Sequence, residues 1–441
     1  MPFELPKEME CERASKALRI AVVYNRLPFP MMRGDQLTVA HLLEFLSTRG
    51  HLVDLYTLNE GGELNQRQQD WLSTTCRHVF SFEQGALAKV FGSLSGLIQR
   101  EPVQVGMFRN SRMRAVLASN IGEEKYDIVY CYYLRASSAV PEKRRLPSTT
   151  KSFLAMQLSQ TLNTRRVAAN ETRRTLRRLF FQVESALMER FESRVWRKFD
   201  RAVLIGPADV EAVREVSRRR NEPEINNWIF GAHGTDTSRF TAADAAEIVT
   251  KRIVFSGSML YPPNVQAVLW FADEILPKVV DSIPDVEFII QGRDPVAEVR
   301  DLASRPGVTV TGTVPDVGEI IRSAGVCVNP MRAAGGMQNK LIEYMASAKA
   351  VVATRIANEG IQAPPSTFIE ANDPREFASA VVSLLSDPQA ARELGARARE
   401  YVLANWTWEK HFLALESAFI DSLDDGSDND LSVGSEAPAA Q

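Results

Sequence analysis

The chain has 441 residues, of which 45% are hydrophobic and 24% charged, and its formal net charge is −3. This length predicts about two domains, the composition is that of a globular protein, and the charge gives no reason to expect nucleic acid as a partner. The four cysteines form no CxxC pair, so neither a zinc site nor a disulfide framework is indicated. The N-terminus is unlike a signal peptide and no apolar run approaches the ~18 residues of a membrane span. We therefore expect a cytoplasmic protein, with attachment to the inner face of a membrane left open.

After a polar leader, residues 1–17, the chain predicts a strand–helix–strand unit. Residues 18–24 are typical of a buried strand, residues 37–46 have helical spacing that stops before Gly50, and residues 51–57 predict a second strand. A unit of this kind favours a parallel sheet.

The loop at residues 25–36 should lie at a ligand site, because ligands of parallel sheets bind outside the carboxyl ends of the strands. Gly34 would let the backbone approach a ligand closely, and Arg26 or Arg33 could meet a phosphate. The alternative is a solvated loop with surface arginines. A further strand at residues 126–132 should end at the same edge of the sheet.

A basic segment follows at residues 161–201, with eleven Lys or Arg side chains against five Asp or Glu, or about +6. Leucine and phenylalanine side chains are interleaved with the arginines around residues 173–181. Residues 165–201 could therefore lie on an anionic membrane surface. The alternative is an ordinary helix that buries an apolar stripe, which the spacing of Val183, Met188 and Val195 favours.

Residues 241–251 show no buried period and are the expected linker to a second α/β region at residues 252–405. Strands and helices alternate regularly there, and Asp373-Pro374 and Asp387-Pro388 predict helix starts. A last helix is expected at residues 406–423. Residues 424–441 contain no Lys or Arg and are expected to be a disordered acidic tail.

One stretch of the second region, from Gly335 to Ala346, carries the clearest chemistry. It follows a predicted strand, and Gly335 and Gly336 precede a helix, whose N-terminal N–H groups would attract an anion. Lys340 and Glu343 are three residues apart and so share one face of that helix. A phosphate, a cation and a carboxylate in this order would suit a nucleotide; the alternative is a glycine-rich loop before an ordinary packed helix.

The second region resembles the donor domain of retaining, nucleotide-sugar-dependent glycosyltransferases of family four, which have the GT-B architecture. The motifs that carry the resemblance agree in order and spacing, and the first region resembles the acceptor domain more loosely, so the match covers roughly residues 18–420. The motifs in the second region are Phe255-Ser256-Gly257-Ser258-Met259 with Pro262-Pro263-Asn264, Gln291-Gly292-Arg293, Gly312-Thr313-Val314-Pro315-Asp316, and Asn339-Lys340-Leu341-Ile342-Glu343-Tyr344-Met345-Ala346.

The resemblance implies two Rossmann-like domains facing across a cleft, an acceptor-side domain at residues 18–240 and a donor domain at residues 252–405, with the C-terminal helix packing back toward the first. It implies a metal-independent hexosyltransferase that moves a sugar from a nucleotide-diphosphate donor to a surface polysaccharide or lipid-linked glycan precursor, without another cofactor.

The resemblance also assigns roles to single residues. Glu343 would hydrogen-bond the donor ribose, and Lys340 or Arg293 would neutralise the leaving diphosphate. The other residues that it places at the donor are Gly257, Asn264, Val314, Gly335, Gly336, Met337, Gln338, Asn339 and Leu341.

The chain also departs from the family pattern. Gly335 stands where many members have a glutamate, Tyr261-Pro262-Pro263 replaces an Arg and Lys pair, and Cys131, Tyr132 and Tyr133 stand where a histidine often ends the strand. Two alternatives therefore remain beside a glycosyltransferase. One is a catalytically weak member that binds a nucleotide sugar or supports a partner enzyme, and the other is a nucleotide-sugar epimerase, whose acid–base side chains would include His41, His51 or His233.

Overall fold

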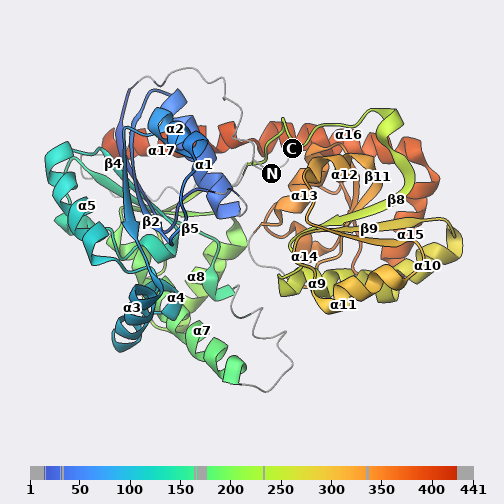
Figure 1. Cartoon of the computed structure of the whole chain (residues 1–441), viewed down its shortest axis with the longest axis horizontal. Helices are drawn as coiled ribbons and strands as arrows, with labels where there is room; N and C mark the ends of the chain where they lie inside the picture. The colour runs from blue at the N-terminus through green and yellow to red at the C-terminus, as the bar shows by residue number, and fades with distance from the viewer. Residues whose placement is uncertain are drawn as a thin grey trace. The chain divides into compact units, whose positions relative to one another are not determined.

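The computed structural model describes residues 14, 16–29, 31, 34–162, 165, 176–231, 234–333 and 337–424. The chain divides into two compact units, a first of residues 1–232 and 409–439 and a second made mainly of residues 233–408 (Figure 1). Most of the leader and the tail expected at the chain ends lie outside the described residues. Within the span 241–251 that the sequence predicts as a linker, strand β8 already begins at Val249.

A seven-stranded parallel sheet forms the centre of the first unit, in the order β3-β2-β1-β4-β5-β6-β7. The two central strands are β1 and β4, and their side chains are almost all buried because helices cover both faces of a doubly wound sheet. The strands are β1 (Arg19–Tyr24), β2 (Leu52–Asn59), β3 (His78–Glu83), β4 (Ile128–Tyr132), β5 (Lys151–Gln157), β6 (Arg201–Leu204) and β7 (Trp228–Phe230).

The helices of the first unit connect these strands and begin at recognisable caps. Asn65 and Gln68 form a capping box at α2, and the side chain of Asn110 accepts the Met113 N–H at α5. The helices are α1 (Gly34–Thr48), α2 (Gln66–Thr75), α3 (Ala86–Ile98), α4 (Val103–Gly106), α5 (Ser111–Glu124), α7 (Leu176–Val195), α8 (Pro207–Arg219) and α17 (Trp408–Asp424).

The second unit has a six-stranded parallel sheet in the order β10-β9-β8-β11-β12-β13. The chain runs from β8 outward in one direction and returns at β11 to run outward in the other, so the strand order reverses between β8 and β11. Ligands of such sheets bind at this reversal, outside the carboxyl ends of the strands. The strands are β8 (Val249–Ser256), β9 (Glu287–Gln291), β10 (Val308–Gly312), β11 (Ala324–Asn329), β12 (Ala350–Ala353) and β13 (Ile369–Glu370).

The helix starts predicted at Asp373 and Asp387 are confirmed, since each carboxylate accepts two backbone N–H groups at the beginning of α15 or α16. One predicted helix is longer than expected, because a π-helical turn at Phe271–Ile275 joins α9 to α10. The helices are α9 (Pro262–Trp270), α10 (Leu276–Ser282), α11 (Ala297–Arg300), α12 (Val317–Ser323), α13 (Asn339–Ala346), α14 (Arg355–Asn358), α15 (Pro374–Ser386) and α16 (Pro388–Asn405).

Helix α17 returns to the first unit and packs on its sheet. The ring of Phe419 lies 4.8 Å from that of Phe153, centroid to centroid. The buried carboxylate of Glu416 accepts hydrogen bonds from Arg49, at 2.8 and 3.1 Å, and from His51 Nε2 at 2.6 Å. His51 Nδ1 in turn accepts the Leu18 N–H at 3.0 Å, so His51 is a structural residue here. The prediction of two parallel-sheet α/β domains, with a C-terminal helix packing on the first, is confirmed.

No helix in the described part of the chain is both long and apolar enough to cross a membrane.

Glu416→Ala should destabilise the first unit by about 3 kcal/mol, because it removes the buried carboxylate that accepts hydrogen bonds from Arg49 and from His51 Nε2. Glu416→Gln keeps one acceptor oxygen and should lose less. Urea unfolding followed by circular dichroism measures both, with the exposed Glu400→Ala as the control. A loss no larger than that of the control would contradict the role assigned to Glu416.

Candidate functional site

The predicted chemistry of the second unit gathers on helix α13, which begins at Asn339 beside the carboxyl end of β11. Gly335 and Gly336, the predicted phosphate loop, lie outside the described residues. The helix is anchored to β8 because the hydroxyl of Tyr344 accepts the Ser256 N–H at 2.6 Å and lies 2.9 Å from Ser256 Oγ. This contact fixes the rotation of α13 and therefore the direction of its other side chains.

Lys340 is buried, with 9% of its surface exposed, and forms no ion pair with any residue that the structure describes. Its Nζ donates to Asn264 Oδ1 at 2.7 Å and lies 4.9 Å from the centre of the Phe255 ring. Burial disfavours the charged ammonium and lowers the pKa of Lys340 to about 8, although the nearby Glu343 carboxylate raises it in part. A bound anion would therefore stabilise the charged form of Lys340.

Asn264 holds Lys340 in place. Its Nδ2 donates to the Ser258 carbonyl at 3.0 Å, so both ends of the amide are engaged within the protein. A Cβ on Gly257 would lie 2.6 Å from Asn264 Nδ2, and one on Gly292 would lie 1.7 Å from the Gly257 carbonyl oxygen. Glycine at these two positions is therefore what lets the loops after β8 and β9 close around Asn264. Asn264, predicted as a donor-binding residue, thus acts as a positioning residue for Lys340.

Arg293 follows β9 at the same edge of the sheet and is half-buried. Its carbonyl accepts the Met259 N–H at 3.0 Å, which joins the loop after β9 to the loop after β8. Among the described residues its guanidinium has no hydrogen-bond or ion-pair partner. Arg293 can therefore offer a bidentate cation to a phosphate.

Glu343 lies one turn beyond Lys340 on α13 and is half-buried, and within the described chain its carboxylate has no hydrogen-bond or ion-pair partner. Burial raises its pKa, and the positive charges of Arg239 and Lys340 lower it in part. A carboxylate that is held rigidly and left unpaired is suited to accept hydroxyl groups of a ligand.

The other predicted donor residues fall into two groups. Met337, Gln338 and Asn339 lie at the start of α13, and Gln338 is buried without a side-chain cap to the helix. Leu341 is fully buried and its N–H donates to the Gln338 carbonyl at 2.9 Å, so neither its side chain nor its N–H is free for a ligand.

Val314 lies apart from the helix start, in the loop after β10. It is half-buried and follows Gly312, whose φ of 67° is a conformation that glycine adopts without strain. Asp316 ends this loop by accepting the Gly318 N–H at 2.8 Å at the start of α12. The loop backbone is thus fixed from both sides.

Sequence reasoning missed Asn329, at the carboxyl end of β11. It is fully buried, and in the described chain neither its Oδ1 nor its Nδ2 has a hydrogen-bond partner. Buried amides are nearly always hydrogen-bonded, so Asn329 is a candidate ligand contact. The available signal was an asparagine at the end of a strand that is otherwise apolar.

A second set of polar side chains lies in the first unit, at the carboxyl ends of β1 and β4. Asn25 is buried without a partner for its amide among the described residues, and Tyr24 donates to Asp35 at 2.9 Å. Tyr133, near the position where a histidine was expected, accepts the Gln160 side-chain N–H at 2.7 Å. Gly34 begins α1, and Arg33 lies outside the described residues.

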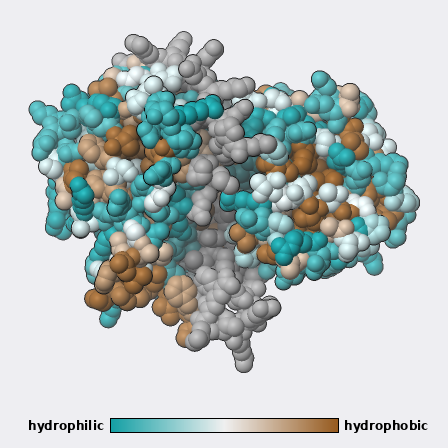
Figure 2. Space-filling view, viewed as in Figure 1, coloured by the Kyte–Doolittle hydropathy of each residue, from teal (hydrophilic) through white to brown (hydrophobic). Residues whose placement is uncertain are grey.

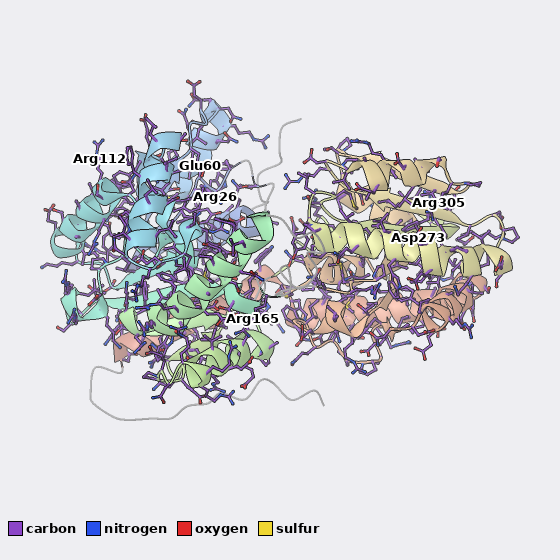
Figure 3. The ribbon with its side chains drawn as sticks, turned by 90° about the horizontal axis from the view of Figure 1, so that it is seen from below. Arg26, Glu60, Arg112, Arg165, Asp273 and Arg305 are labelled. Carbon is purple, nitrogen blue, oxygen red and sulfur yellow. The ribbon has the colours of Figure 1, made fainter. Side chains whose placement is uncertain are left out.

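Within the basic segment at residues 161–201, the structure describes residues 161–162, 165 and 176–201. Arg165 Nε donates to Glu189 at 2.8 Å (Figure 3). Val183, expected in a buried stripe, is half-exposed, whereas Met188 and Val195 are buried. Contact of this segment with a membrane stays a prediction.

Comparison with known proteins supports a glycosyltransferase. Residues 250–387 match the family model of glycosyl transferases group 1. A phosphatidyl-myo-inositol mannosyltransferase of Mycolicibacterium smegmatis is 31% identical over 207 residues, which are 43% of this chain and 52% of that protein. An uncharacterized 44.6 kDa protein in cps region of Klebsiella pneumoniae is 21% identical over 411 residues, which are 90% of this chain and 98% of that protein.

Solved structures agree with the fold. Sucrose-phosphate synthase from Thermosynechococcus elongatus has a TM-score of 0.67 at 17% identity, covering 93% of this chain and all of that one. HepE of Anabaena, in complex with UDP and glucose, has a TM-score of 0.58 at 12% identity, covering 92% of this chain and all of that one. The two parallel-sheet α/β domains are therefore of the GT-B type, as predicted.

Lys340→Met should stabilise the second unit at pH 7 by about 1–3 kcal/mol, because it removes a charge whose pKa is lowered by burial, while the lost hydrogen bond to Asn264 offsets part of the gain. The folded protein binds this proton less tightly than the unfolded chain does. The gain should be complete below about pH 8 and shrink as the pH rises toward about 10, where an unfolded lysine titrates.

Differential scanning calorimetry at pH 7 and near pH 10 measures this effect, with the exposed Lys278→Met as the matched control. Equal gains at both pH values, or a loss at pH 7, would contradict the buried charge assigned to Lys340.

Proposed function

We propose that the protein is a retaining glycosyltransferase that moves a sugar from a nucleoside-diphosphate sugar to a glycan acceptor. The observation that carries the proposal is the pair on α13 at the carboxyl edge of the sheet. It consists of a buried ammonium and, one helical turn away, a carboxylate that has no partner among the residues described. This pair lies inside the region that matches glycosyl transferases group 1.

The nucleotide would be held by its ribose and its diphosphate. Glu343 accepts hydrogen bonds from the ribose hydroxyls, and the backbone around Val314 contacts the base. Lys340 and Arg293 face the diphosphate. Because Lys340 has no counter-ion in the described chain, a diphosphate would supply the opposite charge that its burial lacks.

The bond that breaks joins the anomeric carbon of the sugar to the terminal phosphate oxygen, and the new bond joins the same carbon to the acceptor oxygen. Negative charge develops on the leaving diphosphate, where Lys340 and Arg293 stabilise it. Attack takes place on the face that the diphosphate leaves, so the acceptor proton passes to a departing phosphate oxygen. The configuration is retained without a protein nucleophile, and the proposal includes no metal or other cofactor.

Several names among the similar proteins support the choice of substrates. HepE is described in complex with UDP and glucose, which favours a nucleotide-sugar donor. The Klebsiella pneumoniae relative belongs to a cps region and the Mycolicibacterium smegmatis relative is named for a phosphatidyl-myo-inositol acceptor. We therefore extend the proposal to a surface polysaccharide or lipid-linked glycan precursor as acceptor, in the cytoplasm.

Glu343→Gln should weaken nucleotide-sugar binding by about 10- to 100-fold, because a hydrogen bond to a charged acceptor contributes about 1.5–3 kcal/mol. The protein is first screened by thermal shift against a panel of UDP-, GDP- and ADP-sugars, since a ligand that binds the folded state raises the melting temperature. Calorimetric titration then compares the wild type, Glu343→Gln and the exposed Glu376→Gln control.

Nucleotide-sugar hydrolysis by the same proteins separates the proposal from its alternative. A wild type that binds the donor and cleaves it supports a transferase. A wild type that binds the donor and never cleaves it, with any acceptor tested, favours the catalytically weak member. Unchanged affinity in Glu343→Gln would remove Glu343 from the ribose.

The pH dependence of kcat/KM should show whether activity requires the protonated form of Lys340. The ammonium can neutralise the leaving diphosphate only when protonated, so kcat/KM should fall as the pH rises through about 8. Lys340→Arg stays protonated and should keep a flat profile to higher pH, even if its activity is lower. A wild-type profile that is flat to pH 10, with the fold intact by circular dichroism, would contradict this role.

A further inference from the structure

Helix α3 of the first unit turns its large apolar side chains toward solvent. Leu87 is 75% exposed, Phe91 68% and Ile98 84%, and Val90, Leu94 and Leu97 are also exposed. We call these six residues the α3 surface. Figure 2 shows a continuous hydrophobic patch on this part of the molecule. Monomeric soluble proteins rarely expose a contiguous apolar patch of this kind unless it contacts another surface.

The packing of α3 fixes this orientation. Its inward face is made by Gly92 and Gly96, which lie directly against Gly106 of α4. A Cβ on Gly92 would lie 2.3 Å from the Gly106 carbonyl oxygen, and one on Gly96 would lie 3.1 Å from the Gly106 Cα. The two backbones are in contact, so no larger side chain fits between them. The helix therefore has its glycines inside and its leucine, isoleucine and phenylalanine side chains outside, the reverse of an ordinary surface helix.

Helix α7 extends the apolar character beside α4. The Glu184 carboxylate accepts the Val103 N–H at 2.8 Å and the Gln104 N–H at 3.1 Å, which fixes α7 to the start of α4. The preceding residue, Val183, and Leu179 one turn earlier are both about half-exposed. Helix α4 thus contacts both α3 and α7, and both of these helices carry exposed apolar side chains.

The charges around this support favour an anionic lipid surface over a protein partner. From Gly85 to Gln99 the chain contains a single charged side chain, Lys89, and no acidic one. Lys89 is paired with Glu60 at 3.0 Å, so the exposed ridge offers almost no polar group that could define a protein interface (Figure 3 labels Glu60). Residues 176–201, which include α7, contain seven Lys or Arg against four Asp or Glu, a net charge of about +3. An apolar helical ridge beside basic sequence is typical of helices that lie in a membrane interface.

We propose that the α3 surface docks the first unit on an anionic membrane, with the side chains of Phe91 and Ile98 inserted among the lipid headgroups and acyl chains. The α3 surface belongs to the first unit and shares no residue with the Lys340 site of the second. Docking and sugar transfer can therefore be tested separately.

Co-sedimentation with vesicles tests the proposal on the full chain. One set of vesicles is phosphatidylcholine alone and the other is equal parts phosphatidylcholine and phosphatidylglycerol. The wild type should bind the anionic vesicles at low salt and release as salt rises. The double variant Phe91→Gln, Ile98→Gln should bind them at least tenfold more weakly, because it removes two apolar side chains from the inserted surface.

The matched control is Val280→Gln, Leu403→Gln, which removes two exposed apolar side chains from the second unit. It should bind vesicles like the wild type. Phe91→Trp provides a direct reading, since its fluorescence should shift to the blue when anionic vesicles are added. Thermal unfolding and nucleotide-sugar binding of each variant should match the wild type, so a loss of docking is distinguished from a failure of the donor site.

Three results would overturn the proposal. In the first, the wild type does not bind anionic vesicles at low salt. In the second, the Phe91→Gln, Ile98→Gln variant binds them as tightly as the wild type does. Sedimentation equilibrium without lipid could instead show a dimer that this variant abolishes, in which case the α3 surface binds a second copy of the chain.

Discussion

The burial of the Lys340 ammonium, which has no ion-pair partner in the described part of the chain, is the constraint on which the second unit depends. The nearby Glu343 forms no ion pair with it, and its hydrogen bond goes to a neutral amide, Asn264. Removing a charge from water without pairing it is unfavourable. The contact persists because Asn264 is itself fixed by Ser258 and enclosed by loops in which Gly257 allows close approach. A bound anion would supply the opposite charge that the buried ammonium lacks among the described residues.

The position of Glu343 follows from the same packing. Tyr344 ties α13 to Ser256 on β8, and Leu341 and Met345 are fully buried in the core of the unit. With these three side chains fixed, the helix cannot rotate, so Lys340 and Glu343 keep their spacing. The chemistry of the site is thus set by core residues that never need to touch a ligand, which is how a rigid scaffold preorganises a binding constellation.

Much of this could be predicted from sequence, and the reasons for the failures are physical. Strand and helix alternation from residue 252 onward follows from local periodicity, so the second unit was predicted closely. The role of Asn264 depends on a contact with a side chain 76 residues away, which no local pattern encodes. Asn329 was missed because an asparagine at a strand end is equally compatible with a turn.

Residues 58–125 contain no predicted element, and helix α3 shows what local sequence does and does not encode there. Periodicity locates a helix, and the further assumption that its apolar residues face inward assigns the buried face. In α3 the inward positions are Gly92 and Gly96, and the apolar residues face outward. Glycine lowers helix propensity, but the spacing of the apolar residues is that of a helix, and contact with α4 decides which face turns inward. These apolar residues are Leu87, Val90, Phe91, Leu94, Leu97 and Ile98.

The two units therefore depart from ordinary globular design in opposite ways. The second buries a charge that water would solvate better, and the first exposes apolar side chains that a core would bury better. Each departure destabilises the isolated chain, and in each the packing that maintains it consists of glycines at backbone contacts, Gly257 and Gly292 in one unit and Gly92 and Gly106 in the other. A single larger residue at any of these glycines would force the loops or helices apart. The two proposed ligands, an anion at Lys340 and a lipid surface at α3, would compensate these two unfavourable terms.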